Sequence, residues 1–325
     1  MINDDITDIS GILVGNWTGT NTGCTVILAK NGTVGAVDVR GGAPGTRETD
    51  LLDPSNLVNI VNAICLSGGS AFGLSTATGV VQYLEENDIG YNTGIIKVPI
   101  VPAAVIYDLA VSGPKNRPDS TSGYLAAKNA SSNKINQGNY GAGAGASVGK
   151  LKGMNFAMKS GLGSASLESN GLKVGALMVC NALGDVNNQE GTIIAGLLSD
   201  NKNCIYGSKR YIYQNVARPE NKFCANTVIG VVVTNAKLDK AQARKVAQMA
   251  HDGIARTVYP SHTLYDGDTI FVLATGDYIL NTDVTTIGNF AADMVAKSII
   301  RATCRATQIP GLLSHHEVKE CCCHK

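Results

Sequence analysis

The 325-residue sequence has few charged and few aromatic side chains, which make up 16% and 5% of the chain. An average globular protein has about 25% charged residues. A chain this poor in charge is not expected to be disordered by self-repulsion. Its 27 basic and 26 acidic residues nearly cancel, leaving a net charge of +1. A nucleic acid partner would need a strongly basic surface, so the composition argues against one.

The sequence also lacks the segments that carry a protein into or across a membrane. Its first ten residues, MINDDITDIS, have neither the basic start nor the apolar core of a signal peptide. The longest apolar stretch, residues 95–111, is interrupted by Lys97, Asp108 and two prolines. It cannot supply the roughly 20 uninterrupted apolar residues of a bilayer span. We therefore expect a protein without a membrane partner.

Cysteine is present, but not in the pattern of a disulfide framework. The chain has nine cysteines, which is an odd number. Six of them stand singly: Cys24, Cys65, Cys180, Cys204, Cys224 and Cys304. Secreted domains held by disulfides use even sets of cysteines, so we expect reduced thiols and a cytoplasmic location. The Cys- and His-rich end, residues 315–324, lacks the spacing of a structural zinc site, and we predict no metal and no cofactor.

Glycine, with 37 residues, separates the predicted strands and helices. Apolar runs or alternation predict strands within 12–39 and at 171–183, 191–198, 227–236 and 269–275. Helical periodicity or a capping residue predicts helices at 57–66, 74–87, 122–131, 240–256 and 287–304. Groups of strands alternate with pairs of helices, which favours an α/β sandwich over a Rossmann sheet.

A polar segment without periodicity, residues 197–224, is expected to be an exposed and mobile connector. Almost directly after it begins a buried strand whose first residue is Thr227. Thr227 is either an ordinary β-forming residue or a nucleophile that the chain creates by cutting its own Asn226–Thr227 bond. A cut there would release an α-amine with a pKa of about 7.7 to 8.0, which can serve as base for the weakly nucleophilic hydroxyl.

Five motifs, in chain order, resemble the DmpA-like peptidase family of N-terminal-nucleophile hydrolases. They are GGSAFGL (68–74), VPAAVIYDL (101–109), GAGAGASVGK (141–150), NTVIGVVVTNAKL (226–238) and HTLYDGDTIF (262–271). The resemblance implies an αββα fold related to that of ornithine acetyltransferases. It also implies self-cleavage into an α fragment, residues 1–226, and a β fragment, residues 227–325, which together form one domain. Residues 308–325 are expected to be a disordered tail.

The resemblance assigns roles to single residues. Thr227 matches the nucleophile and Asn226 the residue before the cleaved bond. Asn181 matches an asparagine whose side-chain amide donates a hydrogen bond to the oxyanion, although its residue type alone suggests a turn. Phe72 stands where some members have a tyrosine near the reacting centre. His251 is expected in a packing or surface role.

Lys150, Asp266 and Asp268 complete the predicted site. Lys150 matches an active-site lysine that would lower the pKa of the Thr227 amine by like-charge repulsion, unless it is only a solvated loop residue. Asp266 and Asp268, at i and i+2, point the same way in an extended chain. One would bind Thr227 and the other Lys150, although a plain Asp-Gly turn also explains the sequence. A Thr nucleophile with two aspartates resembles the nylon-oligomer hydrolases more than the D-aminopeptidases, which have Ser and Glu at the places of the aspartates.

We therefore expect an amidohydrolase that forms an acyl-enzyme on an N-terminal threonine. Its substrates would be peptides with an N-terminal D- or β-residue, or 6-aminohexanoate (nylon) oligomers. Two alternatives stay open, an acyltransferase of the ornithine-acetyltransferase type and an inactive binding shell. The family implies a homo-oligomer, commonly a tetramer of cleaved pairs. His262, like His251, is assigned no catalytic part.

Overall fold

The computed structural model of the chain describes residues 3–216, 226–278 and 282–318. Nine strands form one hydrogen-bonded network in the order β10-β11-β14-β16-β2-β4-β7-β3, with β1 beside β2. They are β1 (Ile12–Gly19), β2 (Thr22–Val39), β3 (Thr46–Arg47), β4 (Ile60–Ser67), β7 (Ala103–Val105), β10 (Leu162–Ser169), β11 (Leu172–Asn181), β14 (Thr227–Thr234) and β16 (Thr269–Ala274). β14 runs parallel to β16 and β4 parallel to β7.

The long strand β2 belongs to two sheets. Its first part, up to Ala29, pairs with β1, and its last part, from Val34, pairs with β16. The register with β4 shifts between Leu28 and Thr33. One sheet therefore contains β10, β11, β14, β16 and the end of β2, and the other contains β1, the start of β2, β4, β7 and β3.

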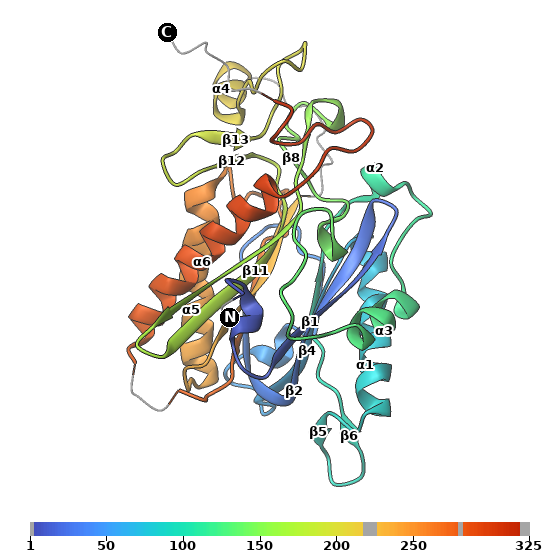
Figure 1. Cartoon of the computed structure of the whole chain (residues 1–325), viewed down its shortest axis with the longest axis vertical. Helices are drawn as coiled ribbons and strands as arrows, with labels where there is room; N and C mark the ends of the chain where they lie inside the picture. The colour runs from blue at the N-terminus through green and yellow to red at the C-terminus, as the bar shows by residue number, and fades with distance from the viewer. Residues whose placement is uncertain (1–2, 217–225, 279–281, 319–325) are drawn as a thin grey trace.

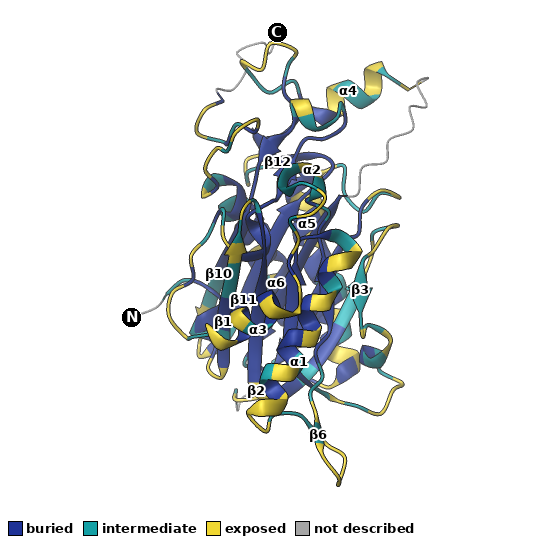
Figure 2. Ribbon diagram, turned by 90° about the vertical axis from the view of Figure 1, so that its right-hand side faces the viewer, coloured by how far each residue is buried: buried dark blue, intermediate teal, exposed yellow. Residues whose placement is uncertain are grey.

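Helices cover the outer face of each sheet. The α-helices are α1 (Thr76–Glu86), α2 (Leu109–Ser112), α3 (Ser120–Lys128), α4 (Ser208–Gln214), α5 (Lys240–Thr257) and α6 (Val284–Cys304). α5 and α6 pack on the first sheet, and α1 and α3 pack on the second (Figure 1). Figure 2 shows buried strands behind helices whose outer faces are exposed. The predicted αββα sandwich is confirmed.

The side chains of β14 show how the layers are filled. Val228 and Val232 belong to the apolar cluster beneath α5 and α6, whereas Ile229 and Val231 belong to the cluster between the two sheets. This alternation follows from the two-residue period of a strand. A third cluster fills the space between the second sheet and α1 and α3. With apolar residues on both faces, β14 is a fully buried central strand.

Short elements connect these layers. The short strands are β5 (Tyr91–Asn92), β6 (Lys97–Val98), β8 (Ser147–Val148), β9 (Met158–Lys159), β12 (Asp185–Asn187), β13 (Ile193–Ala195) and β15 (Val258–Tyr259). The 3-10 helices are η1 (Ile6–Asp8), η2 (Asp50–Leu52), η3 (Ser70–Ser75), η4 (Gly141–Gly143) and η5 (Met154–Phe156).

Predicted elements with clear local signals are confirmed, and one without them is corrected. The helix predicted after Asp239 is α5, where Asp239 and Gln242 form a reciprocal capping box. The helix predicted at 57–66 is instead strand β4. A short, continuous apolar run fits a buried helix and a buried strand equally well, and here β4 is paired on both sides.

Two segments expected to be irregular are partly ordered. The connector 197–224 contains helix α4, and residues 217–225 lie outside the described part. The predicted disorder from residue 308 is wrong for 308–318. Leu312 and Ser314 are buried, and the Leu313 carbonyl accepts the Lys159 N–H at 2.7 Å. These contacts fix the segment, and the rest of the tail, residues 319–325, is outside the described residues.

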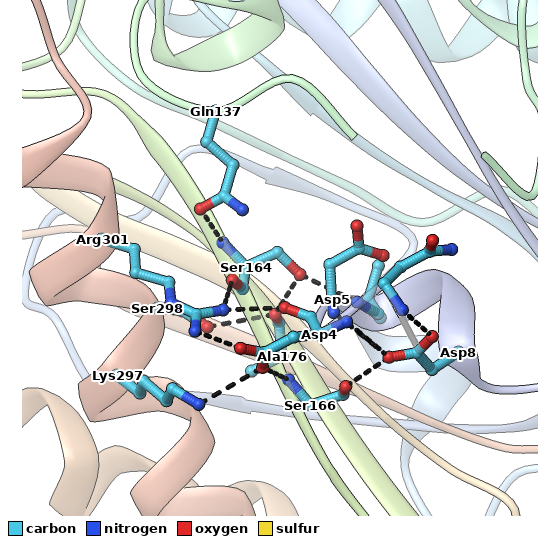
Figure 3. Close-up of polar contacts among 12 residues, drawn as sticks. Asp4, Asp5, Asp8, Gln137, Ser164, Ser166, Ala176, Lys297, Ser298 and Arg301 are labelled. Carbon is cyan, nitrogen blue, oxygen red and sulfur yellow. Dashed lines mark hydrogen bonds and ion pairs between the residues drawn. The ribbon is translucent and has the colours of Figure 1, made fainter. Parts of the chain in front are cut away.

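The N-terminal segment is held against α6 by charge (Figure 3). Arg301 donates to the Asp4 backbone carbonyl at 2.7 Å and to the Ser164 carbonyl of β10 at 2.8 Å. Lys297 lies 3.2 Å from an Asp4 carboxylate oxygen. Burial alone would raise the pKa of Asp4, but the bonds to Arg301 and Lys297 more than offset it and lower that pKa. The segment thereby joins the first sheet to its covering helix.

The state of the cysteines agrees only in part with the prediction. Cys24, Cys65, Cys180 and Cys304 are free thiols. Cys204 is disulfide-bonded, which corrects the expectation for that residue. Among the helices of the described residues, none is both long and apolar enough to cross a membrane.

Candidate active site

Thr227 begins β14, a strand that lies between β11 and β16. Thr227 is only 4% exposed. Asn181, the last residue of β11, is its register partner on one side. On the other side, the turn before β16 approaches, and Asn226 forms a parallel bridge with Asp266. The fold therefore brings the predicted residues of three distant segments to one place.

The peptide bond between Asn226 and Thr227 is held by hydrogen bonds. The Thr227 hydroxyl donates to the Asn226 carbonyl oxygen at 2.5 Å, and the Gly267 N–H donates to the same oxygen at 2.7 Å. The Asn226 N–H donates to the Tyr265 carbonyl at 3.1 Å. A donor stabilises an oxyanion when it lies about 2.7 to 3.1 Å from the position that the charged oxygen will take, and the Gly267 N–H already faces the oxygen that would carry this charge. The hydroxyl, the carbonyl and a donor for its oxygen are thus already assembled.

Gly267 can occupy this position because it has no side chain. A Cβ at this residue would lie 2.7 Å from the Ala43 carbonyl oxygen and 3.1 Å from the Thr227 hydroxyl oxygen. The first distance is well inside the ordinary contact of about 3.5 Å. Only glycine therefore lets this amide approach the Asn226 carbonyl without moving the chain.

Both predicted carboxylates are buried, Asp266 at 2% and Asp268 at 1% exposure. Asp268 accepts the Val228 N–H at 2.8 Å, so it binds β14 one residue after Thr227. Asp266 accepts the backbone N–H and the hydroxyl of Thr263 at 2.9 and 2.5 Å. Burial and the charge of Asp268 raise the pKa of Asp266, and the charge of Lys150 opposes this rise. The carboxylates thus fix the turn and the first residues of the strand in the uncut chain.

Lys150 is buried, at 4% exposure, and is not a solvated loop residue. Its ammonium donates to the backbone and side-chain oxygens of Asn181 at 2.9 and 2.8 Å. The side-chain oxygen of Asn181 also accepts the Ser147 N–H at 3.1 Å, and its amide group donates to the Tyr107 carbonyl at 3.1 Å. In the uncut chain the Asn181 amide is therefore directed at Tyr107, and its oxyanion role stays a prediction.

A second buried lysine, Lys159, donates hydrogen bonds to the loop that carries Lys150. Lys159 is fully buried and donates to the carbonyls of Gly143 and Ala146, both at 3.1 Å, and to that of Ser160. Burial lowers the pKa of Lys159 to about 7. The Lys159 side chain is thus a common hydrogen-bond donor to two carbonyl groups of the glycine- and alanine-rich loop, residues 141–150.

The model of Peptidase family S58 matches residues 4–317. The chain belongs to peptidase family S58. An aminopeptidase of Mycobacterium leprae, described as uncharacterized, is 41% identical over 95% of this chain and 92% of its own. A 6-aminohexanoate-oligomer endohydrolase of Agromyces is 30% identical over 86% of this chain and 80% of its own. The chain is therefore a hydrolase of peptide or amide bonds, which favours that prediction over the acyltransferase and the binding shell.

Solved structures share the fold of this S58 peptidase at low sequence identity. The L-aminopeptidase D-Ala-esterase/amidase of Ochrobactrum anthropi, described as a variant of the Ntn hydrolase fold, has a TM-score of 0.69 and 18% identity, over 97% of this chain and 92% of its own. A β-aminopeptidase of Burkholderia has a TM-score of 0.69 and 19% identity with the same coverage. These similarities support the αββα architecture.

One residue of this S58 site was missed from the sequence. Nδ1 of His262 lies 2.8 Å from an Asp268 carboxylate oxygen, and its backbone N–H donates to the same oxygen at 3.0 Å. The available signal was its position six residues before Asp268, but only the turn brings the two together. The packing role expected for His251 is confirmed, because its side chain is fully buried and its ring meets that of His262 at 4.9 Å.

Two other features of the S58 peptidase have side chains to which we assign no catalytic role. Residues 145–149, GASVG, fit the G-x-S-x-G pattern of a serine-hydrolase elbow. That elbow needs a strand, a turn and an α-helix, whereas Ser147 is buried in the two-residue strand β8. Phe72 is 59% exposed and lies beneath the guanidinium of Arg117 at 3.9 Å. Among the described residues, no cluster of three or more His, Cys, Asp or Glu is placed to hold a metal ion.

Proposed function

We propose that this S58 peptidase cuts its own Asn226–Thr227 bond and then uses Thr227 to hydrolyse short peptides or linear amides. The observation that carries the proposal is the Asn226 carbonyl, which is in contact with both the Thr227 hydroxyl and the Gly267 amide. In the first step the hydroxyl oxygen bonds to the Asn226 carbonyl carbon. The bond from that carbon to the Thr227 nitrogen then breaks, and the nitrogen receives the hydroxyl proton. Water hydrolyses the resulting ester and leaves a free amine on Thr227.

The same groups then serve the substrate. The Thr227 amine takes the hydroxyl proton while the oxygen attacks the substrate carbonyl, and the amine passes this proton to the leaving nitrogen. Departure of the Asn226 carbonyl frees the Gly267 N–H as one donor to the new oxyanion, and Asn181 supplies a second when its amide turns from Tyr107. The positive charge of Lys150 lowers the pKa of the Thr227 amine. Water attacks the acyl-enzyme and completes the cycle.

The substrate class follows from the relatives and from the surroundings of the site. The similar proteins named above are an aminopeptidase and a 6-aminohexanoate-oligomer endohydrolase. Beside Asp266 stand Leu264 at 82% exposure and Tyr265 at 48%, which offer an apolar rim for an aliphatic chain. We propose a short linear amide that bears a free amine, either a peptide with an N-terminal D- or β-residue or an aminohexanoate oligomer.

We place the enzyme in the cytoplasm as a homo-oligomer of cleaved pairs. The buried free thiols of Cys24, Cys65 and Cys180 support a reducing compartment, whereas the disulfide of Cys204 is a bond that an oxidising compartment favours. The low share of charged residues, 16%, is compatible with self-association. Size-exclusion chromatography with light scattering tests the assembly, and a monomer at micromolar concentration would contradict it.

Mass spectrometry and N-terminal sequencing of the purified protein test self-cleavage. We expect wild type to separate into residues 1–226 and 227–325, and Thr227→Ser to do so as well because it keeps a hydroxyl. Thr227→Ala should remain a single chain and hydrolyse no amide substrate. Uncut wild-type protein with full activity would refute the proposal.

A further inference from the structure

One peptide group of the loop before Lys150 links a buried cation to Asn181. The carbonyl oxygen of Ala146 accepts a hydrogen bond from the Lys159 ammonium at 3.1 Å. The N–H of the same peptide group belongs to Ser147, and it donates to the side-chain oxygen of Asn181 at 3.1 Å. Resonance joins the two ends of a peptide group, so a cation at its oxygen makes its N–H a stronger donor. Lys159 is therefore coupled to Asn181 through a single peptide group.

The Lys159 ammonium and this loop depend on each other. The lysine side chain is fully buried, and within the described residues its ammonium has three carbonyl acceptors and no carboxylate partner. Two of these acceptors, the carbonyls of Gly143 and Ala146, lie on the loop, and the third is the carbonyl of Ser160. A buried ammonium needs such acceptors in place of water. A charged hydrogen bond thus fixes the loop directly before Ser147.

The orientation of the Asn181 side chain depends on the donors around its oxygen. That oxygen accepts from the Ser147 N–H and from the Lys150 ammonium, at 3.1 and 2.8 Å. The NH2 group points the other way, to the Tyr107 carbonyl at 3.1 Å. While the oxygen is held in this way, only the NH2 group can be offered to an oxyanion. An amide that turned over would present its partly negative oxygen instead, which would repel the oxyanion.

We propose that Lys159 is a positioning residue, whose ammonium polarises the Ala146–Ser147 peptide group and thereby keeps the Asn181 amide oriented to donate to the oxyanion. This inference rests on the proposed hydrolysis by Thr227. Loss of an oxyanion donor weakens binding of the transition state more than binding of the substrate. Substitution of Lys159 should therefore lower kcat and leave KM nearly unchanged.

Two lysines with similar hydrogen bonds separate positioning from stability. Lys159→Met keeps most of the side-chain volume and removes the charge. Its matched control is Lys240→Met, because Lys240 is 6% exposed and its ammonium also donates to backbone carbonyls. These are the carbonyls of Leu51, Asn56 and Val58, at 3.1, 2.9 and 3.1 Å. Lys240 begins α5 and has no part in the contacts of Asn181 described above.

The assay uses the better of two probes, a 6-aminohexanoate trimer and a β-alanyl dipeptide, and mass spectrometry counts the cut fraction of each variant. We expect folded, cut Lys159→Met to have a kcat lower by roughly tenfold to a hundredfold and a nearly unchanged KM. Lys240→Met should keep the wild-type kcat, whatever stability it loses in urea. Lys159→Gln, which has a neutral donor, should show a similar loss of kcat and replaces Lys159→Met if that variant does not fold.

A double substitution tests whether Lys159 acts through Asn181. In an Asn181→Ala background, Lys159→Met should cause little further loss of kcat, since the amide it orients is gone. The inference is overturned if Lys159→Met keeps the wild-type kcat, if Lys240→Met loses as much, or if the losses from Lys159 and Asn181 simply add. Wild-type protein that hydrolyses neither probe, or does so uncut, would instead refute the proposed function, so the two failures are distinguishable.

Discussion

Substitution of Gly267 by alanine tests the geometry of the cleavage site most directly. The added Cβ would stand 2.7 Å from the Ala43 carbonyl oxygen and 3.1 Å from the Thr227 hydroxyl oxygen. Relief of this overlap has to move the turn, and with it the Gly267 N–H that now lies 2.7 Å from the Asn226 carbonyl oxygen. Loss of one oxyanion donor costs about 2.7 to 4 kcal/mol, or roughly a hundredfold to a thousandfold in rate.

The assay is the first-order conversion of freshly made precursor into its two fragments, followed by gel electrophoresis and mass spectrometry. We expect Gly267→Ala to accumulate as uncut protein with a circular dichroism spectrum like that of Thr227→Ala. Gly276→Ala serves as a control for backbone strain away from the site, because a Cβ there meets no atom within 4 Å but the φ of 80° disfavours a side chain. Cleavage of folded Gly267→Ala at the wild-type rate would show that this amide does not stabilise the transition state.

Three further substitutions have defined outcomes. Lys150→Gln removes a positive charge near the Thr227 amine, so the pKa of that amine should rise. The acidic limb of the kcat/KM profile should then move up by about one pH unit. An unchanged pH profile would contradict this role. Lys159→Met removes the donor that the Gly143 and Ala146 carbonyls share, which leaves each with one backbone N–H as its partner, from Ala146 and Ser160. The substitution should lower the unfolding midpoint in urea and slow cleavage at pH 7. Unchanged urea and cleavage curves would show that the loop does not depend on this cation. Burial raises the pKa of Asp185 to about 6 from 3.8, so the folded state binds this proton more tightly than the unfolded state does. The free energy of unfolding should therefore fall by about 3 kcal/mol as pH rises from 4 to 6, and Asp185→Asn should lack this fall in urea unfolding. Parallel curves for the two proteins would refute it.

The sequence was sufficient where a local signal determines the structure. α5 begins at a capping aspartate and keeps a helical period, and β14 is a β-branched run, so both are predictable. β4 was not, because its apolar run has no period and its pairing with β2 and β7 is decided by the fold. In the site, the resemblance to a known family named Lys150 and Asn181, but their mutual hydrogen bonds depend on strands far apart in the chain.

Backbone groups explain much of what the sequence could not indicate. The donor to the Asn226 carbonyl is the amide of Gly267, and an amide is common to every residue except proline. Only the clash that a Cβ would meet identifies this glycine as special. His262 was overlooked for a related reason, because its contact with Asp268 arises from a left-handed backbone conformation that residue type alone does not predict.

β14 starts at Thr227 and lies between β11 and β16 in the middle of a sheet. A cut before Thr227 would therefore leave two polypeptides that share one sheet. The new N-terminal strand would be paired with β11 of the first fragment and β16 of the second. Once pulled apart, the pieces would have to find each other in solution and thread a central strand back into place, and exposed apolar strands aggregate readily. Unfolding of the cleaved enzyme would then be irreversible. The lifetime of the active enzyme would be set by its unfolding rate rather than by a folding equilibrium.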